Sequence, residues 1–139
     1  MKRVGIAFGV LLFTSVVAMA DDLPTKLPAT AKLLTKAEIV NIYDNKPHKW
    51  VHPAGDKGNG TTTYVSKTET ISGTYNVGGN SGEWEGKITW KNDQYCFSTR
   101  GKGKGKFGPV MCNLIYLDGT TAYEVNPKNK AINSINTPM

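Results

Sequence analysis

The sequence predicts a mainly β fold: a small antiparallel β-meander or barrel-like sheet with one short helix near the N-terminus. Two segments, residues 71–77 and 83–90, alternate apolar with polar side chains, which is the period-two pattern of half-buried strands. The chain also has 15 Gly and 7 Pro, residue types that favour turns between short strands. Residues 36–44 carry the start and stop signals of the single expected helix.

The length of 139 residues corresponds to one domain. Hydrophobic residues make up 39% and charged residues 20% of the chain. These values are near the averages of globular proteins and exclude collagen-like, coiled-coil and wholly disordered chains. We divide the chain into a signal peptide at residues 1–20, a flexible lead-in at 21–33, a single β-rich domain at 34–126 and a frayed tail at 127–139.

The N-terminus predicts export. Lys2 and Arg3 precede an uncharged stretch at residues 4–17, and the small residues that follow predict signal-peptide cleavage between Ala20 and Asp21. The alternative is an N-terminal membrane anchor, but the uncharged stretch is shorter than the ~20 residues that a spanning helix needs. We therefore expect a periplasmic or secreted mature chain without a transmembrane segment.

The helix signature lies directly after the lead-in. Thr35 and Glu38 have the spacing of a capping box, in which each side chain bonds the backbone of the other residue. Leu34 and Ile39 have the spacing of a hydrophobic staple around the same helix start. A helix over residues 36–44 is too short to be stable alone, so we expect it to dock on the sheet and close one end or edge of it.

Short strands account for the rest of the expected domain. Asn92-Asp93 and Asp118-Gly119 are candidate two-residue turns, and residues 78–82 form a longer candidate loop. Six or seven strands of this length make a small barrel or a curled sheet. Besides 71–77 and 83–90, strands are expected at residues 48–52, 61–67, 94–99, 109–117 and 120–125.

Cys96 and Cys112 are the two cysteines of the chain. In an exported protein an even pair of this kind predicts one disulfide. A hairpin from residues 94–99 to 109–117 would bring the two sulfurs together across adjacent strands. The cysteines and the two histidines do not have the spacing of a zinc site, and we expect no metal and no cofactor.

A series of spaced landmarks runs through the expected domain. They are Leu34-Thr35-Lys36-Ala37-Glu38-Ile39, Tyr43, Trp50, Gly73-x-Tyr75, Gly82-x-Trp84, Cys96-Phe97, Cys112 and Gly119 with Tyr123. This pattern resembles a family of small exported bacterial proteins known as domain of unknown function 995. The resemblance covers residues 34–125 and implies a periplasmic or secreted bacterial product with paired cysteines. It implies no particular activity.

Three patterns that could indicate an enzyme have simpler explanations. Residues 103–108 spell G-x-G-x-x-G, but a strand follows where a dinucleotide site needs a helix. His48 and His52 lack a nearby third metal ligand, and we expect them on the surface. Glu83 and Glu85 share a strand face, as paired glycosidase carboxylates could, and we expect them to face water. We therefore expect a non-enzyme; the alternative is a periplasmic or secreted hydrolase of cell-wall or glycan material that uses these residues.

Five aromatic residues are candidates for a ligand-binding face. They could fill a solid core, or they could line a cup or groove for an apolar or sugar ligand, as in small barrels. The sequence leaves both possibilities open. The five residues are Trp50, Tyr75, Trp84, Trp90 and Tyr123.

The excess of basic over acidic residues in the mature chain lies in one segment, which alternates glycine with lysine. We expect residues 100–106 to form a mobile loop, either a plain solvated tip or a contact for an anionic envelope component such as lipopolysaccharide or anionic lipid. Nucleic acid is the least expected target, because no aromatic residue lies between the cations. The sequence thus favours an exported, non-catalytic envelope or binding protein. The candidate contacts are Arg100, Lys102, Lys104 and Lys106.

Overall fold

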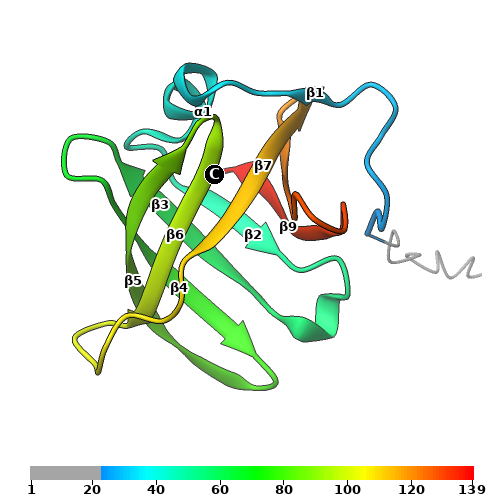
Figure 1. The fold of residues 1–139 in the computed structure, drawn as a ribbon. Coiled ribbons are helices and arrows are strands. Elements are labelled where there is room, and N and C mark those ends of the chain that lie inside the picture. The colour runs from blue at the N-terminus through cyan, green and yellow to red at the C-terminus, as the bar shows by residue number, and fades with distance from the viewer. Residues whose placement is uncertain (1–22) are drawn as a thin grey trace, which may run out of the picture.

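Strand pairing closes the sheet into an antiparallel barrel. The computed structural model describes residues 23–139, which form eight barrel strands and one short helix (Figure 1). The prediction of a mainly β fold with one helix is confirmed, and the sheet is closed rather than open. The predicted signal peptide and its cleavage site lie outside the described residues.

The strands from β2 to β7 are neighbours in chain order around the barrel. β9 lies between β2 and β8, and β8 pairs back onto β7, which closes the ring. The short β1 pairs with the end of β7. The elements are β1 (Lys32–Leu33), α1 (Lys36–Tyr43), β2 (His48–Val51), the 3-10 turn η1 (Gly55–Lys57), β3 (Asn59–Val65), β4 (Thr70–Val77), β5 (Asn80–Lys91), β6 (Gln94–Gly101), β7 (Met111–Asp118), β8 (Thr121–Val125) and β9 (Ile132–Pro138).

The helix closes one end of the barrel. Thr35 and Glu38 form the predicted capping box, which is confirmed by both reciprocal hydrogen bonds. Ile39 and Tyr43 on α1 are buried in a core cluster that also contains Tyr95 of β6. In Figure 1 the helix covers the end of the barrel at which β6 begins.

The predicted loop at residues 78–82 is shorter in the structure. Val77 of β4 pairs directly with Asn80 of β5, so the turn consists of Gly78 and Gly79. Both glycines have positive φ, which a residue with a Cβ adopts at a cost.

The strands expected at residues 48–52 and 61–67 are present as β2 and β3.

The expectation of a frayed tail at residues 127–139 is wrong, because residues 132–138 form strand β9. β9 bonds to β2 on one side and to β8 on the other, and without it the sheet would not close. Ile132, Ile135 and Asn136 of β9 are buried. The sequence pattern was weak here because polar residues of β9 face the interior, so apolar and polar positions do not separate into two faces.

The described part of the lead-in, which was expected to be flexible, packs against the barrel. Leu23 and Leu27 pack against the cluster of Tyr123, Val125 and their neighbours on the outer side of β8 and β9. The residues that follow form β1 along β7. The described part of the lead-in therefore covers the barrel instead of extending from it as a loose segment.

The disulfide joins two adjacent strands, as predicted. Cys96 of β6 and Cys112 of β7 are direct partners in the strand register, and their sulfurs are bonded. The bridge closes the long loop between these two strands. Within residues 23–139 no helix has the length and apolar composition needed to cross a membrane.

Candidate functional site

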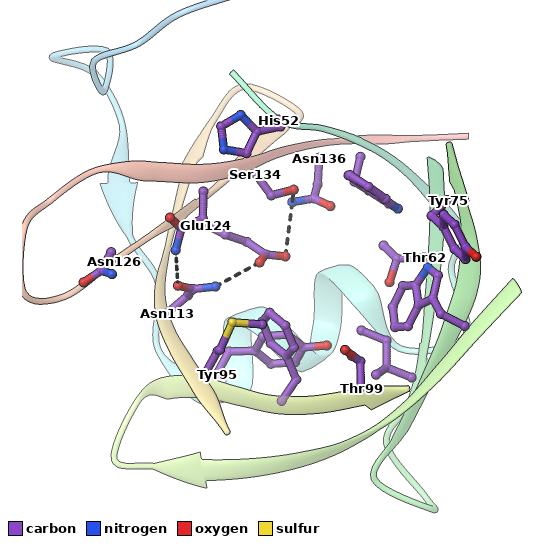
Figure 2. Close-up of a pocket in the computed structure, with 16 residues that line it drawn as sticks. His52, Thr62, Tyr75, Tyr95, Thr99, Asn113, Glu124, Asn126, Ser134 and Asn136 are labelled. Atoms are coloured by element: carbon purple, nitrogen blue, oxygen red, sulfur yellow. Dashed lines mark hydrogen bonds between the residues drawn. The ribbon is translucent and has the colours of Figure 1, made fainter. Parts of the chain in front are cut away.

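The interior of the barrel contains a cavity of about 570 Å³. Every second residue of a strand faces the interior, so each strand contributes side chains to the cavity wall. Figure 2 shows the cavity with α1 behind the lining side chains, at the far end of the barrel in this view. The cavity has an apolar wall (Trp50, Ile71, Tyr75, Trp84, Phe97 and Met111), which Thr62 of β3 interrupts, and a polar wall (Asn113, Glu124, Asn133, Ser134 and Asn136).

Two indole groups on the apolar wall are fixed by the same carbonyl oxygen. Trp50 Nε1 lies 3.2 Å and Trp84 Nε1 lies 3.0 Å from the oxygen of Thr74, and both donate to it. Gly60 provides the space for Trp50, because a Cβ at Gly60 would lie only 2.8 Å from that indole nitrogen and would collide with the Thr74 oxygen. The local sequence therefore holds both tryptophans against the wall formed by β3 and β4.

The polar wall is a hydrogen-bonded network around one carboxyl group. Asn113 Nδ2 donates to Glu124 Oε2 at 3.1 Å, and Asn136 Nδ2 donates to Glu124 Oε1 at 3.3 Å (Figure 2). Asn133 donates to Asn113 Oδ1 at 2.9 Å and so orients that amide. Asn136 also donates to the hydroxyl of Ser134. Residues of β7, β8 and β9 thus position Glu124 toward the cavity.

The barrel changes the acidity of Glu124. Burial raises the pKa of this carboxyl to about 7, and the hydrogen bonds from Asn113 and Asn136 oppose part of that rise. The carboxyl therefore exchanges its proton near neutral pH. Burial also raises the pKa of Tyr43 and Tyr95 well above 10, and the charge of Glu124 adds to both shifts.

Two side-chain oxygen atoms of residues that line the cavity have no hydrogen-bond partner within the described residues. Thr62 Oγ1 and Asn136 Oδ1 are buried and make no hydrogen bond within residues 23–139. Both residues line the cavity. A buried polar group without a partner costs about 1–3 kcal/mol, so each of these two atoms destabilises the cavity wall by an amount of this order.

The structure brings together three of the five aromatic candidates. Trp50, Tyr75 and Trp84 line the cavity. Trp90 instead packs with Tyr64 and Tyr95 in the core, and its indole donates to Glu69. Tyr123 belongs to the cluster beneath the lead-in. Of the two possibilities left open by the sequence, the hollow interior applies to Trp50, Tyr75 and Trp84, and the packed core applies to Trp90 and Tyr123.

Glu124, Asn113 and Asn136 are site residues that the sequence did not predict. On β8, Tyr123 and Val125 alternate with Glu124, a pattern that is usually read as an apolar inner face and a polar outer face. Here the lead-in buries the outer face, so the carboxyl faces inward. A buried strand with one acidic residue among apolar neighbours is the signal that could have found it.

The basic segment folds back onto β5. Arg100 pairs with Glu85 at 2.8 Å, and Lys102 pairs with Glu83 at 3.2 Å. The backbone N–H of Gly103 also donates to Glu85. Glu83 is exposed, as expected, whereas Glu85 is only half-exposed beside Arg100, which corrects the expectation that both glutamates simply face water.

The cations of this segment differ in whether a carboxylate pairs with them. The N–H of Gly103 and the Arg100 guanidinium both lower the pKa of Glu85, which keeps this carboxylate ionised. The ion pairs within residues 23–139 do not include Lys104 or Lys106. Both lysines are exposed. They are the candidate contacts whose charge is available to an external partner.

The two histidines lie in different surroundings. His48 is buried against Tyr43, with ring centroids 4.5 Å apart, which corrects the expectation of a surface position. Burial lowers the pKa of His48. His52 lines the cavity (Figure 2). Among the described residues there is no group of three or more His, Cys, Asp or Glu side chains that could hold a metal ion.

No protein-family model, curated protein or solved structure matches the chain. The resemblance to domain of unknown function 995 therefore stays a prediction.

Proposed function

We propose that the chain is an exported, non-catalytic binding protein that holds one small, largely apolar ligand inside its barrel. The observation that carries the proposal is the cavity of about 570 Å³ with an aromatic wall. Binding pockets for small molecules typically measure about 300–1,000 Å³, are mostly apolar and contain a few placed polar groups. Eight-stranded barrels are wide enough to hold one small ligand.

The alternative, a hydrolase of cell-wall or glycan material, has less support. Its candidate carboxylates Glu83 and Glu85 are paired with Lys102 and Arg100 and do not line the cavity. Glycoside hydrolysis commonly uses two facing carboxylates. The cavity lining contains one, Glu124.

The proposal also assigns a role to the basic segment at residues 100–106. Lys104 and Lys106 would contact an anionic component of the cell envelope, such as lipopolysaccharide or anionic lipid, and hold the barrel near that surface. Each cation near an anionic surface contributes up to about 1 kcal/mol at low salt. The disulfide is compatible with a periplasmic or secreted location.

A fluorescence titration with the neutral apolar probe N-phenyl-1-naphthylamine tests the binding proposal. We expect saturable binding with one site per chain, weakened severalfold by Trp84→Leu, which removes an aromatic side chain from the cavity wall. Phe107→Leu is the matched control, because Phe107 packs against Arg100 outside the cavity. Absence of saturable binding, or equal weakening by both variants, would contradict the proposal.

A further inference from the structure

We propose that the ligand is an organic cation, an amine or guanidinium head group on an apolar or aromatic body, and that Glu124 is the carboxylate that receives the head group. This inference rests on the proposed binding function and names the class of ligand. It follows from the chemistry of the polar wall, which offers acceptors to the cavity.

The network around Glu124 leaves its accepting capacity unfilled. Each carboxylate oxygen accepts one amide bond, from Asn113 or Asn136, and retains a further lone pair. Asn136 Oδ1 is a buried acceptor without a donor within the described residues, and it belongs to the same amide that holds Glu124. A head group with several N–H donors would fill the free accepting positions of the Glu124 carboxylate. Ammonium has three such donors and guanidinium has five.

The charge of the lining favours the same ligand. Glu124 is the one carboxylate among the residues that line the cavity, and the lining contains no lysine or arginine. An anionic ligand would therefore meet a negative group with no cation to offset it. A cation would meet its opposite charge within the barrel cavity, where solvent screens the attraction less than on the outer surface.

The apolar wall suits the remainder of such a ligand. Trp50, Trp84 and Phe97 provide aromatic surface for an apolar body, and aromatic faces also attract cations. Trp50 and Trp84 are already oriented by their bonds to the Thr74 oxygen, so little side-chain freedom is lost when the ligand binds. The cavity thus combines an apolar wall with an acidic head-group site.

Three ligands that share one body test the inference: 2-(2-naphthyl)ethylamine, the neutral 2-(2-naphthyl)ethanol and the anionic 2-naphthylacetate. At a pH above the pKa of Glu124, we expect the amine to bind about tenfold or more tighter than the alcohol, and the acid to bind weakest. Glu124→Gln keeps the size of the side chain and removes its charge. It should abolish the advantage of the amine and leave the affinity for the alcohol nearly unchanged.

The pH dependence of the wild-type protein gives a second readout that needs no variant. The pKa of Glu124 is about 7. Between about pH 8 and about pH 6 the ionised fraction falls about tenfold, and amine affinity should fall several-fold, by at most the same factor. The alcohol should show no such dependence. Amine binding near pH 7 should also release a proton, which calorimetry in buffers of different ionisation enthalpy detects.

Other titratable groups around Glu124 need a control. Tyr43 of α1 and Tyr95 of β6 have strongly raised pKa values and stay neutral over this range. His48 of β2 is buried beside Tyr43, with a lowered pKa. His52 also lines the cavity, and a His52→Asn variant separates its effect from that of Glu124. We expect this variant to retain the pH dependence of amine binding.

The outcomes separate this inference from the proposed function. If the alcohol binds while the amine gains no advantage, or if Glu124→Gln leaves that advantage intact, the inference is overturned and the binding function stands. If neither the three naphthyl ligands nor the neutral probe binds, both are overturned. If Glu124→Gln does not fold, the wild-type pH series and proton release decide the question.

Discussion

Asn136 donates its side-chain amide to Glu124, with 3.3 Å between Nδ2 and Oε1. This bond joins β9 to β8 at the wall of the cavity (Figure 2). The last strand therefore has two functions: it closes the barrel, and it holds the one carboxyl group of the cavity lining in place.

Removal of residues 127–139 should abolish cooperative folding, because β2 and β8 would each lose a strand partner and the network around Glu124 would lose Asn136. Circular dichroism during urea unfolding measures this. Deletion of Met139 alone is the control and should retain a cooperative transition, since this residue lies beyond β9. A cooperative transition of unchanged midpoint in the longer truncation would contradict the role assigned to β9.

Replacement of Glu124 by Gln should change how stability depends on pH. The pKa of Glu124 is raised from the ordinary 4.5 to about 7, so between these values the folded chain holds a proton that the unfolded chain has lost. Unfolding there releases a proton, and the free energy of unfolding falls as pH rises. From about pH 4 to about pH 8, wild type should lose about 3 kcal/mol relative to Glu124→Gln.

The comparison of the two proteins removes the contribution of His48. Burial lowers the pKa of His48, so its contribution to stability grows as pH rises through its unfolded pKa, opposite in sign to that of Glu124. It is common to both proteins and cancels in the difference. Urea unfolding at several pH values provides the numbers, and a difference that does not vary with pH would contradict the assignment.

Replacement of both Cys96 and Cys112 by Ala should lower the free energy of unfolding by about 3 kcal/mol, because the bridge restricts the unfolded chain over the loop that it closes. A reductant should destabilise the wild-type protein by a similar amount and leave the double variant unaffected. An effect of reductant on the double variant would show a cause other than the bridge.

Replacement of Lys104 and Lys106 by Ser should reduce retention on anionic lipid vesicles at low salt, and high salt should remove the difference because ions screen exposed charges. Lys102→Ser is the matched control, since the charge of Lys102 is paired with Glu83. The control should retain more binding than the double variant. Equal retention of all proteins on vesicles at low salt would leave the segment as a solvated loop.

The fold was predictable where the signal is local. The capping box of Thr35 and Glu38 involves residues close in the chain, and the helix begins where that pattern places it. The alternation in β4 and β5 and the cysteine pair were equally informative. Each of these features depends on a few neighbouring residues or on one simple pairing rule.

The site was less predictable because it depends on which faces of the barrel are covered. Glu124 faces inward since the lead-in buries the opposite face of β8. β9 places Ser134 and Asn136 inside, so its sequence lacks the apolar alternation of a strand on a solid core. Whether Trp50 and Trp84 fill a core or line a cavity depends on how the sheet closes, which no short segment specifies.

The central claim, that the barrel interior binds a small apolar ligand, is tested most directly by the indole N–H signals of the three tryptophans in NMR. Trp50 and Trp84 line the cavity, whereas Trp90 packs in the core and donates to Glu69. During titration with N-phenyl-1-naphthylamine, we expect the signals of Trp50 and Trp84 to shift together and saturate, with little change at Trp90. Saturable binding that leaves the signals of Trp50 and Trp84 unchanged would place the ligand elsewhere and contradict the claim.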